Sequence, residues 1–261
     1  MKSFGLINDI WASRQLWFTL SKLDLVSRFR GTRLGLAWLL ISQIGTFYIT
    51  ALIWSKIFKL DFNDFFIYIG LGFATWGFIS NSIAYSASSV FSGISTYLNS
   101  NTPMVVGPCR VTAANLYVFV LGIFIPVTLS LAINQIPFAN LGLLFVGLIL
   151  MILFVLTISI IVSVISIKYK DIPPALGVVF QLLFVISPII YTAEMLESRG
   201  IGFFADINPF YWALYVVREP LISASFPDLK YYSYLALITV TFSVISIVFV
   251  TKNSRKYLLH A

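Results

Sequence analysis

Charged residues are scarce in this chain, at 10% of its 261 positions, whereas 59% of the residues are hydrophobic and mean hydropathy is +0.94. Globular domains carry about a quarter charged residues, which keep their surfaces hydrated. Five stretches contain no Asp, Glu, Lys or Arg: 34–55, 65–109, 111–167, 172–193 and 231–251. This scarcity excludes a water-soluble domain and predicts an integral membrane protein.

Cysteine and histidine each occur once. Cys109 alone excludes an intrachain disulfide framework, and His260 without a Cys/His cluster argues against a zinc or haem site. The chain also lacks G-x-x-x-x-G-K-[ST], H-E-x-x-H and G-x-S-x-G sequences. The first 30 residues lack the apolar core and cleavage site of a signal peptide. We therefore expect no metal, no catalytic residue and no cofactor in this chain.

The apolar stretches predict an all-α protein with six transmembrane helices, because a bilayer core needs roughly 20 apolar residues per span. The predicted spans are 34–58, 65–91, 111–133, 141–167, 174–191 and 234–250. They contain almost no ionisable group of the kind that ion-coupled carriers keep for their coupling ion. Uphill transport would therefore need energy from a partner protein.

The segments outside these spans complete a single permease domain, 1–261. Residues 1–33 have an apolar stripe at helical spacing and predict a helix in the cytoplasmic interface. Residues 92–110 form a polar cytoplasmic connection. Residues 193–230 are too long for a tight turn, and Asn208-Pro209 before an aromatic run predicts short re-entrant external helices. An ordinary external loop is the alternative.

Basic residues set the orientation, since they gather on cytoplasmic segments. With both termini in the cytoplasm, 12 Lys and Arg lie inside and 5 outside, whereas 3 acids lie inside and 7 outside. The net charge of +7 thus reflects topology and calls for no nucleic-acid partner.

Aromatic residues make up 16% of the chain, and several fall within predicted spans. Tyr and Trp can stack on sugar rings and donate hydrogen bonds from their polar tips. The candidates for a channel lining are Phe47, Tyr48, Trp54, Trp76 and Tyr85. Core packing or lipid contact is the simpler explanation for each of them.

Three segments stand out together: residues 23–38 read LDLVSRFRGTRLGLAW, residues 187–191 read SPIIY, and Asn208-Pro209 is followed by Arg218-Glu219. Together they resemble the permeases of ABC transporters that export polysaccharides, and the O-antigen exporters (Wzm-like) most of all. The first segment is similar to the family's R-D-x-x-x-R-[YF]-[RK]-x-x-x-L-G-x-x-W signature, with Leu23 in place of its first Arg. Ser187-Pro188-Ile189-Ile190-Tyr191 resembles an S-P-x-x-Y segment. Asn208-Pro209, followed by Arg218-Glu219, resembles an N-P…R-[DE] segment. The likeness covers essentially the whole chain.

The resemblance implies a homodimer in the bacterial inner membrane, joined to two copies of an ATPase subunit that binds ATP and Mg. Its substrate would be an undecaprenyl-diphosphate-linked polysaccharide. The residues at the substrate entry and the lipid head group would be Arg28, Arg30, Gly31, Arg33 and Gly35. Those that couple to the ATPase would be Asn99, Asn101, Pro108 and Arg110. The outer gate would comprise Ser187, Pro188, Tyr191, Asn208, Pro209 and Arg218. Topology anchoring and attraction to anionic lipid, about 1 kcal/mol per residue, would also explain the three arginines.

Other functions remain open at this point. One is an ABC permease for capsule, teichoic acid, a drug or another lipid. Another is a membrane-embedded glycosyl- or acyltransferase, which would need an acidic or His cluster at the membrane surface. A purely structural membrane scaffold is the third.

Overall fold

The computed structural model describes residues 5–90, 92, 102–133, 140–223 and 225–258, the side chains of 252–258 excepted, and within them every regular element is a helix. Five helices are long and apolar enough to cross a membrane. They are α3 (Ala37–Phe58), α4 (Phe62–Ser89), α6 (Val106–Ala132), α7 (Leu141–Lys168) and α12 (Leu229–Leu258). The chain is therefore a multi-pass membrane protein, as predicted.

The remaining predicted span is the shorter apolar helix α8 (Ile172–Ile186). Its 15 residues reach about 22 Å, less than a hydrocarbon core of about 30 Å. The prediction that this helix continues to residue 191 was wrong. Ser187 leaves the helix with ψ 137°, the extended conformation that a following proline imposes, and Pro188 cannot donate a helical hydrogen bond.

The N-terminal segment forms two helices, α1 (Leu6–Ala12) and α2 (Arg14–Ser27), where one interfacial helix was predicted. The break lies at Ser13, whose hydroxyl and backbone N–H both donate to the Asp9 carbonyl, at 2.6 and 3.1 Å. Such a local side-chain bond competes with continuation of the helix.

Helix α4 lies at the centre of the bundle and packs against α3, α6, α7, α8 and α11 (Pro209–Ile222). In the most apolar 18-residue window, 72% of α4 is buried, compared with 11% of α3. Helix α3 therefore lies at the periphery and leaves most of its surface for lipid or another chain.

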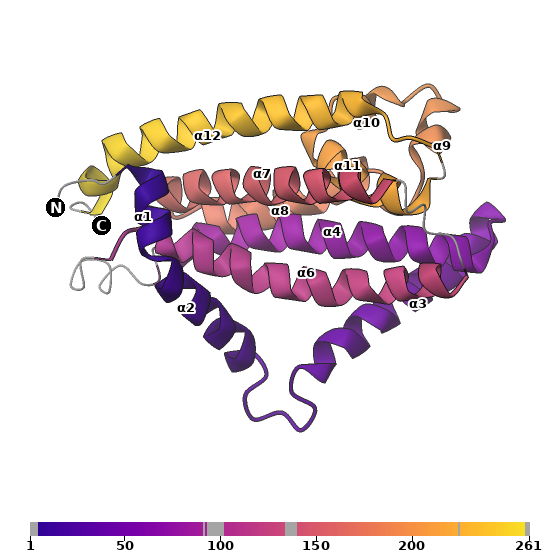
Figure 1. The fold of residues 1–261 in the computed structure, drawn as a ribbon, viewed down its shortest axis with the longest axis horizontal. Coiled ribbons are helices and arrows are strands. Elements are labelled where there is room, and N and C mark those ends of the chain that lie inside the picture. The colour runs from indigo at the N-terminus through magenta and orange to yellow at the C-terminus, as the bar shows by residue number, and fades with distance from the viewer. Residues whose placement is uncertain (1–4, 91, 93–101, 134–139, 224, 259–261) are drawn as a thin grey trace.

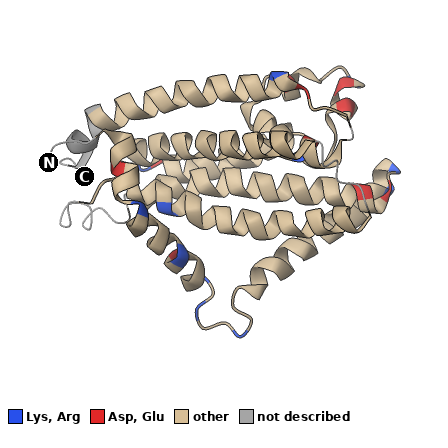
Figure 2. Cartoon of the chain, viewed as in Figure 1, with Lys and Arg blue, Asp and Glu red and all other residues tan. Residues whose placement is uncertain are grey.

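Charge divides the bundle into two ends (Figure 2). We call the acidic end the one formed by the α3–α4 turn, α11 and the two short helices α9 (Ala193–Glu197) and α10 (Phe203–Asp206). The basic end is the opposite one, where α1 begins and α12 ends (Figure 1). The chain enters α8 at the basic end and reaches α9 at the acidic end, so α8 and residues 187–192 together traverse the bundle.

Helices α2 and α3 diverge from the bundle and form a V-shaped arch (Figure 1). Residues 28–36 join them, and we call this segment the arch loop. Its two glycines adopt positive φ, +86° at Gly31 and +53° at Gly35, which side chains rarely permit. The tight turn of the arch thus depends on residues without a Cβ.

Candidate functional site

The acidic end is organised by the break after α8. Ser187 is fully buried, and its hydroxyl accepts a hydrogen bond from Asn208 Nδ2 at 2.8 Å. Asn208 also caps α11, because its Oδ1 accepts from the Phe210 N–H at 3.0 Å. Pro209 occupies the first turn of α11, where a missing N–H costs nothing. One amide side chain therefore joins the end of α8 to the start of α11.

Arg218 holds the broken segment from the other side. Its side chain is only 3% exposed; Nη1 donates to the Pro188 carbonyl at 2.9 Å, and the guanidinium lies 3.9 Å from the centre of the Tyr68 ring. The Tyr68 hydroxyl donates to the carbonyl of Tyr191 at 2.9 Å and lies 3.3 Å from that of Pro188. We call Arg218 and Tyr68, with these carbonyls, the clamp.

Arg218 forms no ion pair with Glu194 or Asp206 within the described part of the chain. Its direct contacts in the described structure are instead a carbonyl and an aromatic ring. Asp206 lies 3.9 Å from Lys230 and accepts from the Tyr231 hydroxyl at 3.0 Å.

Sequence reasoning missed Tyr68, which lies 120 residues before Pro188. No spacing in the sequence joins the two positions, because only the packing of α4 on residues 187–191 brings them together. The packing is close at Gly72, where an added Cβ would lie 3.3 Å from the Ile189 carbonyl oxygen.

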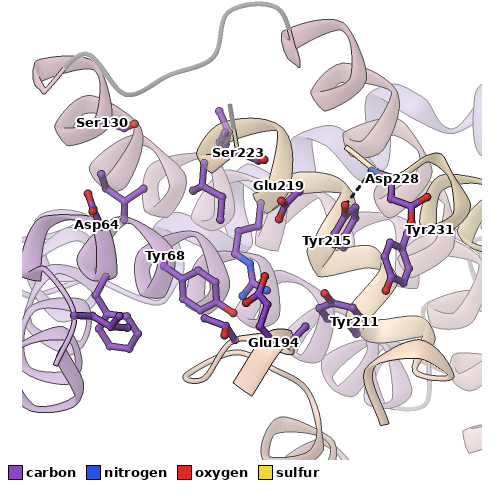
Figure 3. Close-up of a pocket in the computed structure, with 18 of the residues that line it drawn as sticks. Asp64, Tyr68, Ser130, Glu194, Tyr211, Tyr215, Glu219, Ser223, Asp228 and Tyr231 are labelled. Atoms are coloured by element: carbon purple, nitrogen blue, oxygen red, sulfur yellow. Dashed lines mark hydrogen bonds between the residues drawn. The ribbon is translucent and has the colours of Figure 1, made fainter. Parts of the chain in front are cut away.

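A cavity of about 880 Å³ opens beside the clamp, between the start of α4, α9, α11 and the start of α12 (Figure 3). Its ionisable lining is mostly acidic, and tyrosines lie between the acids. The carboxylates are Asp61, Asp64, Glu194, Glu197, Glu219 and Asp228, the cations Arg218 and Lys230, and the tyrosines Tyr68, Tyr211, Tyr215 and Tyr231. Carboxylates accept hydroxyl hydrogen bonds and tyrosines stack on apolar ring faces, so the cavity suits a hydroxylated ligand.

Glu219 lies half-buried at the edge of this cavity. Burial raises the pKa of its carboxyl above the ordinary value, Arg218 partly offsets the rise, and Glu194 adds to it. Burial likewise raises the pKa of Tyr215, whose hydroxyl accepts from the Asp228 N–H at 3.0 Å. Burial on α11 thus disfavours the charged forms of both Glu219 and Tyr215.

The arch loop presents its arginines differently. Arg30 and Arg33 are exposed, and Arg28 lies over the Tyr85 ring, 5.5 Å from its centre. Thr32 fixes the turn, since its hydroxyl donates to the Phe29 carbonyl at 2.8 Å and accepts from the Gly35 N–H at 3.1 Å. Three cations therefore stand on an ordered turn in open surroundings.

The five aromatic candidates for a channel lining divide by burial. Phe47 and Trp76 are 2% and 7% exposed and pack in the core of the single chain. Tyr48 and Tyr85 are 49% and 52% exposed, and Trp54 is half-buried. Only the last three are within reach of a ligand outside the core in this conformation.

The predicted coupling residues also fall into different places. Asn99 and Asn101 lie outside the described residues. Pro108 and Arg110 belong to α6, which begins five residues before the predicted 111, and Pro108 is buried there. Arg110 forms an ion pair with Asp24 of α2 at 3.4 Å. Residues 106–110 are therefore part of the bundle, because α6 packs against α2, α4 and α7 and Val106 joins a buried cluster with Val90 and Ile167.

Two comparisons with known proteins bear on this architecture. Residues 15–222 match the sequence profile of a family described as ABC-2 type transporter. The chain is also 22% identical over 195 residues, 75% of each protein, to the O-antigen export system permease protein RfbA of Myxococcus xanthus. The matched segment runs from α2 to the end of α11 and includes the arch loop and the clamp.

Proposed function

The chain belongs to the ABC-2 type transporter family, and from this premise we propose that it exports an undecaprenyl-diphosphate-linked polysaccharide of the O-antigen kind across the bacterial cytoplasmic membrane. As a family member it is a transport subunit without a catalytic domain, and an ATPase partner is implied. The similarity to an O-antigen export permease supports this choice among the family's cargoes.

The proposed assembly is a homodimer with two ATPase copies, which bind ATP and Mg. Helix α3 supports a dimer, because the single chain buries only 11% of the residues in its most apolar 18-residue window. The rest of that surface is available to a second copy. The described membrane-spanning helices carry charges only near their ends, away from the mid-membrane positions where ion-coupled carriers keep a charged coupling site. Energy would therefore come from the ATPase.

The arch is the observation that carries the proposal. Arg28, Arg30 and Arg33 lie on the arch loop, which joins α2 to the membrane-spanning helix α3 at the vertex of the V (Figure 1), and basic residues prefer the cytoplasmic side. A lipid diphosphate is an anion at the membrane surface, and guanidinium groups bind phosphate oxygens in pairs. The arch loop would thus receive the head group while the polyprenyl tail stays in lipid.

The clamp and cavity at the acidic end would form the outer gate. Residues 187–191 are non-helical, and such backbone at membrane depth lies against protein or a water-filled path. Here their carbonyls are held by Arg218 and Tyr68. The hydroxyl-accepting cavity beside them would meet a glycan as it leaves.

The test is depletion of the chain in its native cell, followed by analysis of surface and lipid-linked glycans. We expect surface polysaccharide to fall while its undecaprenyl-linked form accumulates inside. Normal surface glycan, with a different lipid or a drug retained instead, would refute the proposal and favour another cargo of the same family. A complex with its ATPase that hydrolyses ATP but ignores purified lipid-linked glycan would refute it independently.

A further inference from the structure

A second polar pocket lies within the membrane-spanning part of the bundle. It occupies about 200 Å³ between α3, α4 and α6, nearer to the basic end. We call it the amide pocket, after the polar residues among its lining: Ser42, Gln43, Thr46, Asn81 and Asn115. None of the described residues that line it is charged.

Two polar atoms of this pocket have no hydrogen-bond partner among the described residues. They are Gln43 Oε1, an acceptor, and Asn115 Nδ2, a donor, and Asn115 is only 3% exposed. Native proteins leave few buried polar atoms unsatisfied, so each needs an explanation. Gly122 provides space for the Gln43 amide, because an added Cβ there would lie 3.0 Å from both of its terminal atoms.

The pocket opens toward the surface between α3 and α4. Ser42, Thr46 and Asn81 are exposed although all three lie within membrane-spanning helices. The Ser42 and Thr46 hydroxyls donate to carbonyls of their own helix. The exposed Asn81 amide at that depth instead calls for protein or a water-filled path, since hydrocarbon offers no partner. The surface over the amide pocket is therefore a wall of a polar path.

The arch loop lies next to this path. Tyr85 follows Asn81 by four residues on the same face of α4, and Arg28 lies over its ring. Four residues of helix correspond to about 6 Å along its axis. Arg28 thus contacts a ring that lies about one helical turn along α4 from Asn81 of the amide pocket.

We propose that the amide pocket binds the first sugar of the lipid-linked glycan, through a hydroxyl or acetamido group that pairs with Gln43 and Asn115, while Arg28 faces the diphosphate. This inference rests on the proposed function. Sugar hydroxyl and acetamido groups both donate and accept hydrogen bonds, as the two amides require. The pocket carries no charge to attract the diphosphate itself.

The experiment uses the complex of the full chain with its ATPase in lipid nanodiscs. The probes are undecaprenyl diphosphate and the same lipid bearing one N-acetylhexosamine, each titrated against ATPase rate. The variants Asn115→Leu and Gln43→Met keep side-chain size and remove the amide. We expect each to raise the half-maximal concentration of the sugar-bearing lipid roughly two- to tenfold, the effect of one neutral hydrogen bond, without changing that of the bare lipid.

Thr112→Val is the matched control. Thr112 lies one turn before Asn115 in α6, is 4% exposed and has an unpartnered hydroxyl, but does not line the pocket. It should leave both titrations unchanged. If the amide variants keep the full preference for the sugar, or weaken both lipids equally, the pocket is filled by water or acts through the fold and the inference fails. If neither lipid stimulates the wild-type complex, the proposed function fails instead.

Discussion

Arg218 at the acidic end and the arginines of the arch loop place the same side chain in opposite settings. Arg218 is 3% exposed and is held by a carbonyl and an aromatic ring, whereas Arg30 and Arg33 face outward. A buried guanidinium whose contacts are already made within the chain stabilises the fold, because moving it would leave the Pro188 carbonyl without its donor. Exposed guanidiniums on an ordered turn remain available to a ligand.

The comparison teaches that the clamp and the arch loop carry different tasks. Residues 187–191 have lost helical hydrogen bonds, and the clamp replaces them with side-chain donors from α4 and α11. The arch loop is fixed instead by Thr32 and by glycines at positive φ. Changes at the acidic end should therefore act on assembly and gating together, and changes in the arch on substrate response alone.

The largest effect is expected for Arg218→Ala. The substitution removes a charged donor from the Pro188 carbonyl and a cation from the Tyr68 ring, a loss of roughly 2–3 kcal/mol. We expect lower thermal stability of the complex and loss of surface glycan. Arg218→Lys should not restore either, because an ammonium lacks the planar fork of arginine.

Arg199→Ala is the control for this change, since Arg199 is an exposed cation in the same external region. Its yield, ATPase rate and surface glycan should match the wild type. Equal behaviour of the two alanine variants would show that Arg218 is an interfacial anchor and would remove the clamp from the gate.

Gly147→Ala should have the next largest effect, and it tests the support behind the clamp. Helix α11 crosses α7 so closely that an added Cβ at Gly147 would clash with the carbonyl group of Val216. Because that carbonyl belongs to the backbone, it cannot move aside as a flexible side chain would. The helices must separate, at a cost of about 2 kcal/mol. Gly142→Ala, where nothing lies within 4 Å, is the control in the same helix. Equal melting temperatures of the two purified variants would contradict the close crossing.

Gly31→Ala acts in the arch loop and should have a smaller effect. With φ +86°, alanine there costs about 1 kcal/mol of local strain, while nothing within 4 Å opposes the methyl group. We expect a weaker ATPase response to lipid-linked glycan at unchanged complex stability. Gly45→Ala, in open space within helix α3, should leave both unchanged. A loss of stability equal to that of Gly147→Ala would contradict the distinction between the clamp and the arch loop.

The helices themselves were predictable because hydrophobicity marks each span directly. The predicted 141–167 corresponds to α7 at Leu141–Lys168, and Asn208-Pro209 marks the start of α11. Errors arose where local signals competed with apolar content, as at Ser13, which breaks the N-terminal helix, and Pro188, which ends α8 early.

The contacts of the site could not be predicted. Arg218 and Pro188 were selected from a resemblance, but their joint contact with Tyr68 depends on how α4 packs. The amide pocket was missed for a similar reason. Gln43 and Asn115 are isolated polar residues in two separate spans, and nothing in their spacing indicates that α3 and α6 bring them together.

Glu219 offers the smallest and most local prediction, a pH dependence confined to the acidic end. Burial raises its pKa, Arg218 and the Ser223 hydroxyl lower it, and Glu194 raises it, with burial dominant. A carboxyl whose pKa is higher in the fold than in the unfolded chain binds its proton more tightly when folded, so it favours the fold below its folded pKa. As pH rises from the ordinary value of 4.5 and through the raised pKa, the charge forms in a half-buried site and stability falls. Glu219→Gln removes this loss, so melting temperatures of the purified variant and wild type should diverge in that window, with the variant higher above it. Parallel curves would mean that Arg218 already neutralises Glu219, and the clamp would then be an ion pair.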